Sequence, residues 1–212
     1  MIFDLGGVLA RNGRHSDFSA RYPDHDPVTV TQLLLGDYAS DTDHPWHRLE
    51  RGEISLAENR ELNRAALASA GITMPPLPEA GSTGSNGSSF AFELNAPMIE
   101  LVGELRAASP RIKLGVLTNN VREFRPIWWD MLPFDEWFDD VVDSHEVGLR
   151  KPNPAIYELA LDRLGVPAAR TAFHDDVASN LTPASALGIH AVLVDEDPSA
   201  AIVAVRSLAA LD

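Results

Sequence analysis

Short apolar runs alternate with helical patterns in the second half of the chain. The runs that predict strands lie at residues 113–117, 141–142, 171–174 and 190–194. Residues 154–164 predict a helix that ends at Gly165. Asn95, with Pro97 in the first turn, predicts the start of another helix. Because strands separated by helices connect by right-handed crossovers, this order predicts an α/β fold with a parallel sheet flanked by helices.

The first residues of the chain also predict a strand. Ile2 and Phe3 are apolar, and a glycine turn follows directly after Asp4. A strand that runs into a glycine turn is typical of a functional loop. Only three residues precede Asp4, whereas a central strand usually has about five or six, so we expect the natural chain to begin upstream.

The stretch between these two parts carries helical patterns joined by polar connectors. Ser55 and Glu58 form a capping box, which predicts the start of a helix that runs to Gly71. Residues 79–89 are rich in glycine and serine and cannot bury an apolar face, so we expect a flexible connector there. The predicted domains are a core of residues 1–12 and 95–212 and a small α-helical domain of residues 13–94.

The composition narrows the possible functions. The 212 residues include 31 acidic and 17 basic side chains, a formal net charge of −14, so neither nucleic acid nor a membrane surface is an expected partner. The chain has no cysteine, which excludes disulfides, thiolate metal sites and a cysteine nucleophile. Without a signal peptide or a membrane-length apolar run, we expect a cytoplasmic protein, and both a monomer and a homodimer stay open.

Four polar clusters follow predicted strands or precede a predicted helix. They are Asp4, Thr118 with Asn119, Lys151, and Asp175 with Asp176. The carboxyl ends of parallel strands share one edge of a sheet, so these clusters are expected to converge there. Each cluster alone also fits ordinary turn, helix-capping or surface chemistry, and only their convergence predicts a site.

The chemistry of these side chains suits a phosphate group and a divalent cation. Adjacent carboxylates such as Asp175 and Asp176 are hard oxygen ligands of the kind that hold Mg²⁺, and Asn180 could orient them. Lys151 is one of only two lysines in the chain, and prolines beside it fix the backbone ahead of a helix. The fixed backbone would hold the Lys151 side chain in one direction.

The histidines contribute less to the prediction. His44 and His47 are closely spaced, but Pro45 disrupts helical geometry and no third ligand is obvious, which argues against a metal site. His174 is expected to pack at the inner end of its strand.

Taken in order, the polar clusters strongly resemble the four motifs of the haloacid dehalogenase-like hydrolase superfamily. Residues 144–157 and 186–192 are also similar to that family. Residues 46–55 resemble the helical cap that a phosphatase-like subfamily inserts between its first and second motifs. The resemblance implies a Rossmann-like core domain and assigns residues 13–94 to the cap.

The resemblance also implies a role for each cluster. Asp4 would be the nucleophile that attacks phosphorus and forms an aspartyl-phosphate. The phosphoryl oxygens would be held by Thr118, Asn119 and Lys151. Mg²⁺ would be bound by Asp4, the Gly6 carbonyl oxygen and Asp175, with Asp176 supporting its shell. These roles agree with the physics of phosphoryl transfer, in which positioning and charge neutralisation dominate.

One position departs from the family pattern. The phosphatases of the family usually carry a second aspartate two residues after the nucleophile, as general acid and base, and here that position is Gly6. Without it, the leaving oxygen would depart unprotonated or take its proton from water or from a cap residue such as His15 or Asp17.

The expected function is a Mg²⁺-dependent phosphatase that hydrolyses a small phosphorylated metabolite. The first alternative is a 2-haloacid dehalogenase, which uses an aspartate nucleophile on carbon and needs no metal. Asp175 and Asp176 speak against it, because neighbouring carboxylates disfavour each other's ionisation when no cation is present. The second alternative is a phosphate-metabolite-binding protein that has low turnover because of Gly6.

Overall fold

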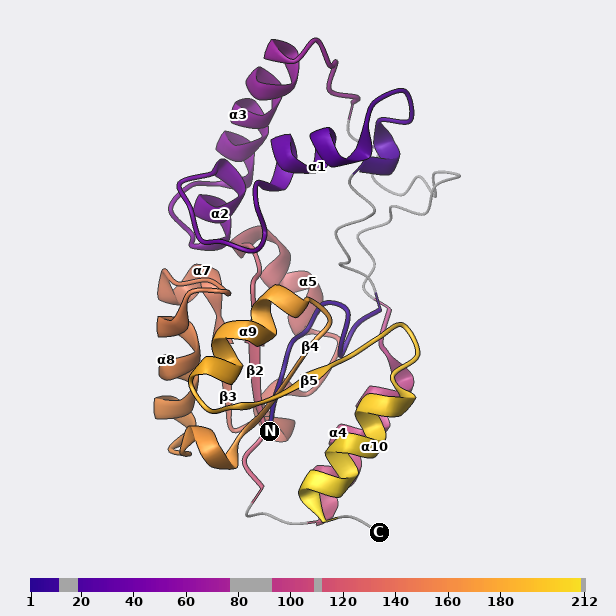
Figure 1. The fold of residues 1–212 in the computed structure, drawn as a ribbon, viewed down its shortest axis with the longest axis vertical. Coiled ribbons are helices and arrows are strands. Elements are labelled where there is room, and N and C mark those ends of the chain that lie inside the picture. Colours follow the sequence, from indigo (N-terminus) through magenta and orange to yellow (C-terminus); the bar gives the residue numbers. More distant parts are fainter. Residues whose placement is uncertain (12–18, 77–92, 109–111, 211–212) are drawn as a thin grey trace.

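A parallel sheet of five strands, in the order β3-β2-β1-β4-β5, forms the centre of the computed structural model (Figure 1). The structure describes residues 1–11, 19–76, 93–108 and 112–210. The strands are β1 (Ile2–Phe3), β2 (Gly115–Thr118), β3 (Asp140–Asp143), β4 (Ala172–Asp175) and β5 (His190–Leu193). The predicted α/β fold is confirmed. The strand bounds shift slightly, because Thr118 and Asp175, predicted to follow their strands, are the last residues of β2 and β4.

Helices cover both faces of the sheet, because successive strand residues point to opposite sides. Ile2 packs on one face and Phe3 on the other, each within a separate apolar cluster. The Phe3 face is covered by α4 (Ala96–Ala108), α5 (Arg125–Trp129), α6 (Phe134–Trp137) and α10 (Ser199–Ala209). The Ile2 face is covered by α8 (Pro154–Leu164) and α9 (Ala178–Ala186). The helix predicted at residues 154–164 is confirmed, and Gly165 ends it with φ 65°.

The register of the sheet sets where the functional side chains lie. Phe3 is paired with Val116 on β2 and with His174 on β4, so Asp4 follows β1 between the ends of its two neighbours. His174 is buried, and its Nδ1 lies 2.8 Å from the carbonyl oxygen of Ile2, which confirms its predicted place in the core. The carboxyl edge of the sheet thus gathers the ends of β1, β2 and β4.

A second group of helices stands beyond that edge (Figure 1). It consists of α1 (Pro27–Leu35), α2 (Pro45–Glu50) and α3 (Leu56–Ser69), and we call residues 19–76 the α1–α3 layer. The layer has its own apolar cluster, which includes Val30, Leu35 and Leu67. The predicted capping box of Ser55 and Glu58 starts α3.

The chain enters and leaves this layer at neighbouring points of the core. Ala10 bridges Leu94 in antiparallel fashion, and the amide of Arg11 donates to the carbonyl oxygen of Glu93 at 2.7 Å. The predicted connector at residues 79–89 and the candidate proton donors His15 and Asp17 lie outside the described residues.

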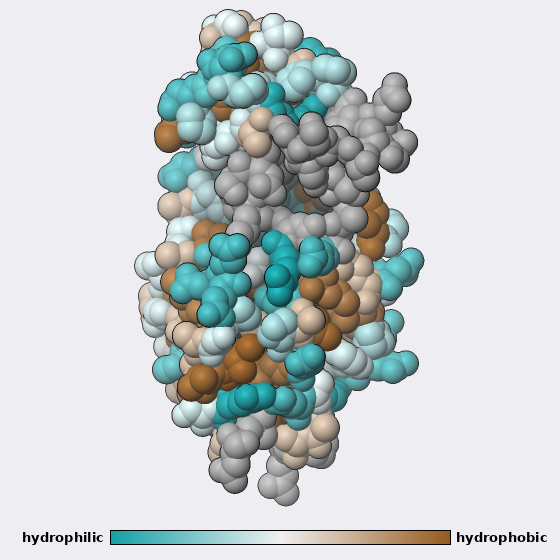
Figure 2. Space-filling view, turned by 90° about the vertical axis from the view of Figure 1, so that its right-hand side faces the viewer, coloured by the Kyte–Doolittle hydropathy of each residue, from teal (hydrophilic) through white to brown (hydrophobic). Residues whose placement is uncertain are grey.

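Polar contacts join the α1–α3 layer to the core. The amide of Leu56 donates to Glu123 at 2.9 Å, and Gly52, with φ +70°, leaves no room for a Cβ against the carbonyl oxygen of His145 in α7 (Ser144–Val147). On the face shown in Figure 2, hydrophilic residues dominate the upper part, and the larger apolar patches lie over the lower part. Within the described ranges, no helix is both long enough and apolar enough to cross a membrane.

Candidate active site

Asp4 lies at the carboxyl end of β1 in direct contact with Lys151. Its Oδ1 is 2.9 Å from the Lys151 Nζ and accepts a hydrogen bond from the amide of Leu5 at 2.7 Å. Only 8% of Asp4 is exposed, and Lys151 is 1% exposed. One oxygen of Asp4 is therefore held by two donors, which fixes the direction of the carboxylate.

Lys151 is held at both its tip and its backbone. Its Nζ lies 2.7 Å from the Asp175 Oδ2 and donates to the carbonyl oxygen of Leu117 at 3.0 Å. The side chain of Asn119 donates to the Lys151 carbonyl oxygen at 2.9 Å and accepts from the Lys151 amide at 2.8 Å. The lysine is thus aimed by Asn119 as well as by the neighbouring prolines, and the Asn119 carboxamide is a positioning group.

Asp175 is fully buried at the end of β4 and is oriented by its neighbours. Asn180 donates to both of its carboxylate oxygens at 3.1 Å, as predicted, and the amide of Val177 donates to Oδ1 at 2.8 Å. Asn180 is itself fixed, because the Tyr157 hydroxyl donates to the main-chain carbonyl oxygen of Asn180 at 2.7 Å. Thr118 is buried at the matching end of β2.

The structure brings three carboxylates together at this edge. Asp4, Asp175 and Asp176 each offer an oxygen atom within 4.8 Å of the others. Burial raises the pKa of Asp4, and the charges of Asp175 and Asp176 add to that rise although Lys151 opposes it. Burial alone would lower the pKa of Lys151, but Asp175 and Asp4 outweigh it and raise the pKa. Three hard oxygen donors facing one lysine fit a divalent cation such as Mg²⁺.

The glycine turn after Asp4 is closely packed at Gly7. Gly7 has φ +74°, and a Cβ there would collide with the carboxylate of Asp176. Gly6, in contrast, does not have a positive φ. The backbone therefore requires glycine at position 7, whereas at position 6 it does not adopt the left-handed conformation that favours glycine.

A polar cluster from the α1–α3 layer reaches this edge and was not found in the sequence. The Tyr38 hydroxyl donates to Glu50 at 3.1 Å, and the pKa of Tyr38 responds to Asp4 and Asn119 nearby. Glu50 contacts Arg150, the neighbour of Lys151 in the chain, with 2.6 Å between Oε2 and Nε. No local pattern could reveal these contacts, because the partners lie about a hundred residues apart.

His44 and His47 each accept a local hydrogen bond through Nδ1. The His44 Nδ1 accepts from the amide of Trp46 at 3.1 Å and starts α2, and the His47 Nδ1 accepts from the amide of Thr42 at 3.0 Å. Among the described residues, the only acidic or histidine cluster able to hold a cation is Asp4, Asp175 and Asp176.

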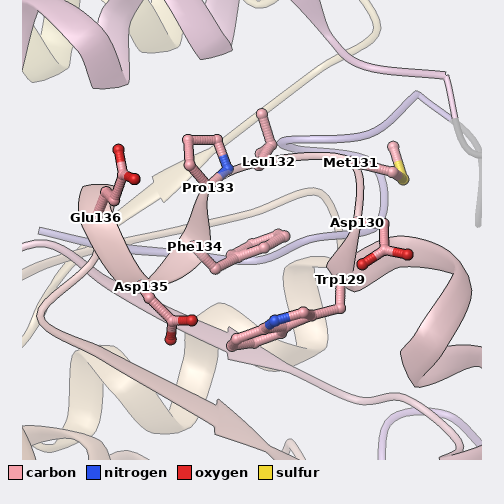
Figure 3. Close-up of a pocket in the computed structure, with 8 residues that line it drawn as sticks. All are labelled: Trp129, Asp130, Met131, Leu132, Pro133, Phe134, Asp135 and Glu136. Carbon is pink, nitrogen blue, oxygen red and sulfur yellow. The ribbon is translucent and has the colours of Figure 1, made fainter.

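A surface pocket of about 450 Å³ lies elsewhere, over the connection between α5 and α6 (Figure 3). It is lined by residues 129–136, and the ring of Trp129 stacks on that of Phe134 with 5.1 Å between centroids. None of the predicted site residues lines it. The carboxyl edge of the sheet remains the candidate active site.

Comparisons with known proteins show what the chain is similar to. A family model described as haloacid dehalogenase-like hydrolase matches residues 1–188. Acyl-CoA dehydrogenase family member 10 of Mus musculus is 31% identical over 205 residues, covering 94% of this chain and 18% of that protein. Bifunctional epoxide hydrolase 2 of Mus musculus is 28% identical over 214 residues, covering 93% of this chain and 36% of that protein. The chain thus spans well under half the length of these two relatives.

A relative of similar length is the sesquiterpene phosphatase astK of Aspergillus oryzae, 26% identical over 196 residues that cover 89% of this chain and 85% of that protein. Among solved structures, a HAD family enzyme from Bacteroides thetaiotaomicron in complex with magnesium and inorganic phosphate aligns with a TM-score of 0.62 at 20% identity, over 92% of this chain and 93% of that one. The L-2-haloacid dehalogenase of Xanthobacter autotrophicus aligns with a TM-score of 0.57 at 19% identity, over 91% and 76%. At these identities the structures share the fold.

Proposed function

The chain belongs to the haloacid dehalogenase-like hydrolases, and from that premise we propose that it is a Mg²⁺-dependent phosphatase that acts on a small phosphorylated metabolite. One observation carries the proposal. Asp4, an aspartate at the end of the central strand, is in direct contact with the buried Lys151 and lies beside the carboxylates of Asp175 and Asp176. An anionic nucleophile, one fixed cation and a second cation-binding group are what attack on a phosphate anion requires.

The proposed reaction has two displacements at phosphorus. In the first, a carboxylate oxygen of Asp4 forms a bond to phosphorus while the bond from phosphorus to the ester oxygen breaks. In the second, water attacks the same phosphorus, releases inorganic phosphate and regenerates the Asp4 carboxylate. Lys151 would stabilise the negative charge that develops on the phosphoryl oxygens in both steps.

Further roles follow from the positions of the neighbouring groups. The ligands proposed for Mg²⁺ are Asp4, the Gly6 carbonyl oxygen, Asp175 and Asp176. When bound, the cation would neutralise the phosphate charge that Lys151 alone cannot balance. Thr118 would contribute its hydroxyl to a phosphoryl oxygen. The side chain of Asn119 is engaged with the Lys151 backbone, so its direct contribution would come from its main-chain amide.

Two relatives support a phosphatase. The astK protein is named a sesquiterpene phosphatase, and the Bacteroides enzyme was crystallised with magnesium and inorganic phosphate. The α1–α3 layer stands over the same edge of the sheet as the candidate site, where we propose that it acts as a cap that encloses the substrate (Figure 1).

A 2-haloacid dehalogenase is the competing enzyme, since one such enzyme shares the fold. Its chemistry needs an ionised aspartate without a metal. Here the carboxylates of Asp175 and Asp176 lie beside Asp4, and like charges this close disfavour each other's ionisation unless a cation is bound. The metal-dependent reaction is therefore the better fit.

A screen of phosphorylated metabolites tests the proposal. We expect phosphate release with Mg²⁺ present and its loss when the metal is chelated, and restoration when Mg²⁺ is returned in excess. Phosphate detection and halide detection on 2-haloacids are run on the same preparation. Halide release that survives chelation would favour the dehalogenase, and phosphate binding without release would favour the low-turnover binding protein.

The glycine at position 6 predicts a steep dependence of rate on the leaving group. General acid catalysis contributes about 10²- to 10⁴-fold, so aryl phosphates should be cleaved faster than alkyl phosphates by a factor of that order. A burst of leaving group before slow turnover is also expected, because the water that attacks the aspartyl-phosphate lacks a base. The measurement is the rate against leaving-group pKa by stopped flow.

Gly6→Asp is the matched test of that prediction. The backbone at Gly6 is not left-handed, so the new side chain adds no conformational strain. The variant should flatten the leaving-group dependence and remove the burst. A wild-type protein with a flat dependence and no burst would show that another residue moves the proton.

A further inference from the structure

The loop between α1 and α2 is held rigidly beside the candidate active site. It begins at Gly36, whose φ of +73° ends α1, and Asp37 then accepts hydrogen bonds from the amide of Ala39 at 3.0 Å and the hydroxyl of Ser40 at 2.8 Å. These contacts fix the backbone on both sides of Tyr38. The loop therefore presents Tyr38 in one defined position.

Arg150 of the core contacts this loop in two ways. Its guanidinium donates to the carbonyl oxygen of Ser40 at 2.7 Å and lies 5.1 Å from the centroid of the Tyr38 ring. Arg150 is fully buried and Glu50 is 2% exposed, so their ion pair, 2.6 Å from Nε to Oε2, is formed away from water. A buried pair of this kind fixes geometry more than it adds stability.

Glu50 is the centre of the cluster. It accepts from the Arg150 Nε at 2.6 Å, from the Trp46 Nε1 at 2.9 Å and from the Tyr38 hydroxyl at 3.1 Å. The contact with Tyr38 is the longest of the three. It is therefore the one that most readily gives way to another acceptor, such as an oxygen of a bound substrate.

Tyr38 also lies toward the phosphoryl site, because its ring is 5.1 Å from the guanidinium of Arg150, the chain neighbour of Lys151. Asn119, the group that holds the backbone of Lys151, and Asp4 are both close enough to influence the pKa of Tyr38. Burial and the negative charges of Glu50 and Asp4 raise the pKa of Tyr38 well above its usual value, so the phenol stays protonated. A neutral donor at this point can face a phosphate ester without repelling it.

Resting on the proposed function, we propose that Tyr38 is the substrate-contacting residue of the α1–α3 layer. Its hydroxyl donates a hydrogen bond to the organic side of the phosphate ester, next to the transferred phosphoryl group. Glu50 and Arg150 are positioning residues that hold Tyr38 there. This assigns the ester side of the substrate to the layer and the phosphoryl side to Asp4, Lys151 and the metal ligands.

Tyr38→Phe tests the proposal, because it keeps the ring that packs on Arg150 and removes only the hydroxyl. We expect kcat/KM for the best alkyl phosphate of the screen to fall about tenfold to a hundredfold, as for loss of a substrate hydrogen bond. Inhibition by inorganic phosphate, which lacks the ester side, should stay unchanged. Tyr22→Phe, in the apolar cluster of the same layer, is the matched control and should leave both values unchanged.

The positioning residues are tested by a double-mutant cycle. Glu50→Gln should lower kcat/KM for the ester without altering phosphate inhibition, and combining it with Tyr38→Phe should add little further loss. If Glu50→Gln does not fold, Trp46→Phe removes one donor to the same carboxylate and takes its place in the cycle. Fully additive losses would overturn the positioning role.

The failures are distinguishable. If the wild-type protein releases no phosphate from any ester in the presence of Mg²⁺, the proposed function fails. If the wild type is active and Tyr38→Phe is equally active, only the role of Tyr38 fails. A loss of phosphate inhibition parallel to the loss of ester turnover would also overturn that role, because it would show that Tyr38 acts through Asn119 and Lys151.

Discussion

Asp4→Asn is expected to lower phosphate release by on the order of 10⁵-fold or more, the scale seen when a covalent nucleophile is removed. The amide nitrogen and oxygen of asparagine form no acyl phosphate, and the residue loses a charge that the divalent cation needs. Because Asp4 is buried against Lys151 and close in shape to asparagine, the variant should fold. The measurement is single-turnover phosphate release with Mg²⁺ at saturation.

Asp130→Asn supplies the control, since Asp130 is exposed at the end of α5 and does not belong to the cluster of three carboxylates. Its activity should equal that of the wild type. A second readout is mass spectrometry of the acid-quenched enzyme, which should detect a phosphate adduct on the wild type and none on Asp4→Asn. Residual turnover within about a hundredfold of wild type would remove Asp4 from the role of nucleophile.

Lys151→Met is expected to lower kcat/KM by about 10³- to 10⁵-fold, the range for removal of a cation that stabilises a transferring phosphoryl group. Lys151 touches both Asp4 and Asp175, so the variant also leaves two buried carboxylates without their partner. Breaking a buried ion pair in this way costs about 3–5 kcal/mol of stability. Methionine keeps the length of the apolar stem and isolates the loss of charge.

The effect on stability should itself depend on the metal. Excess Mg²⁺ would offset the same carboxylate repulsion, so the loss of melting temperature should be larger with chelator than with Mg²⁺. Lys113→Met is the control, because Lys113 precedes β2 at the opposite end of that strand and forms a half-exposed pair with Asp139 at 2.8 Å. Equal losses in activity for the two variants would show that Lys151 is not the cation that stabilises the phosphoryl group.

The sequence predicted the part of the site that parallel-sheet geometry determines. Asp4 directly follows β1 and Asp175 ends the neighbouring strand β4, so their convergence follows from the order of strands and helices alone. The hydrogen bonds of the Asn119 side chain with the Lys151 backbone could not be predicted in this way. A side chain after a strand can serve a ligand or the neighbouring backbone, and only the position of the segment before α8 shows that it holds Lys151.

The contacts of the α1–α3 layer were hidden for a different reason. Glu50 and Arg150 form their pair across about a hundred residues, and each one alone resembles a solvated surface charge. The capping box at Ser55 was predictable because it depends on residues three apart. Local chemistry is therefore readable from the sequence, whereas the docking of the layer on the core depends on the packed fold.

The hydrogen bond from Arg11 to Glu93 and the bridge of Ala10 with Leu94 join the two ends of the inserted segment between residues 11 and 93. The entropic cost of closing such a segment grows only with the logarithm of its length. Different helical insertions could therefore be exchanged at the same two ends while the sheet and its carboxylates stay in place. In evolutionary terms, the choice of substrate in such a protein can diverge independently of the chemistry that cleaves it.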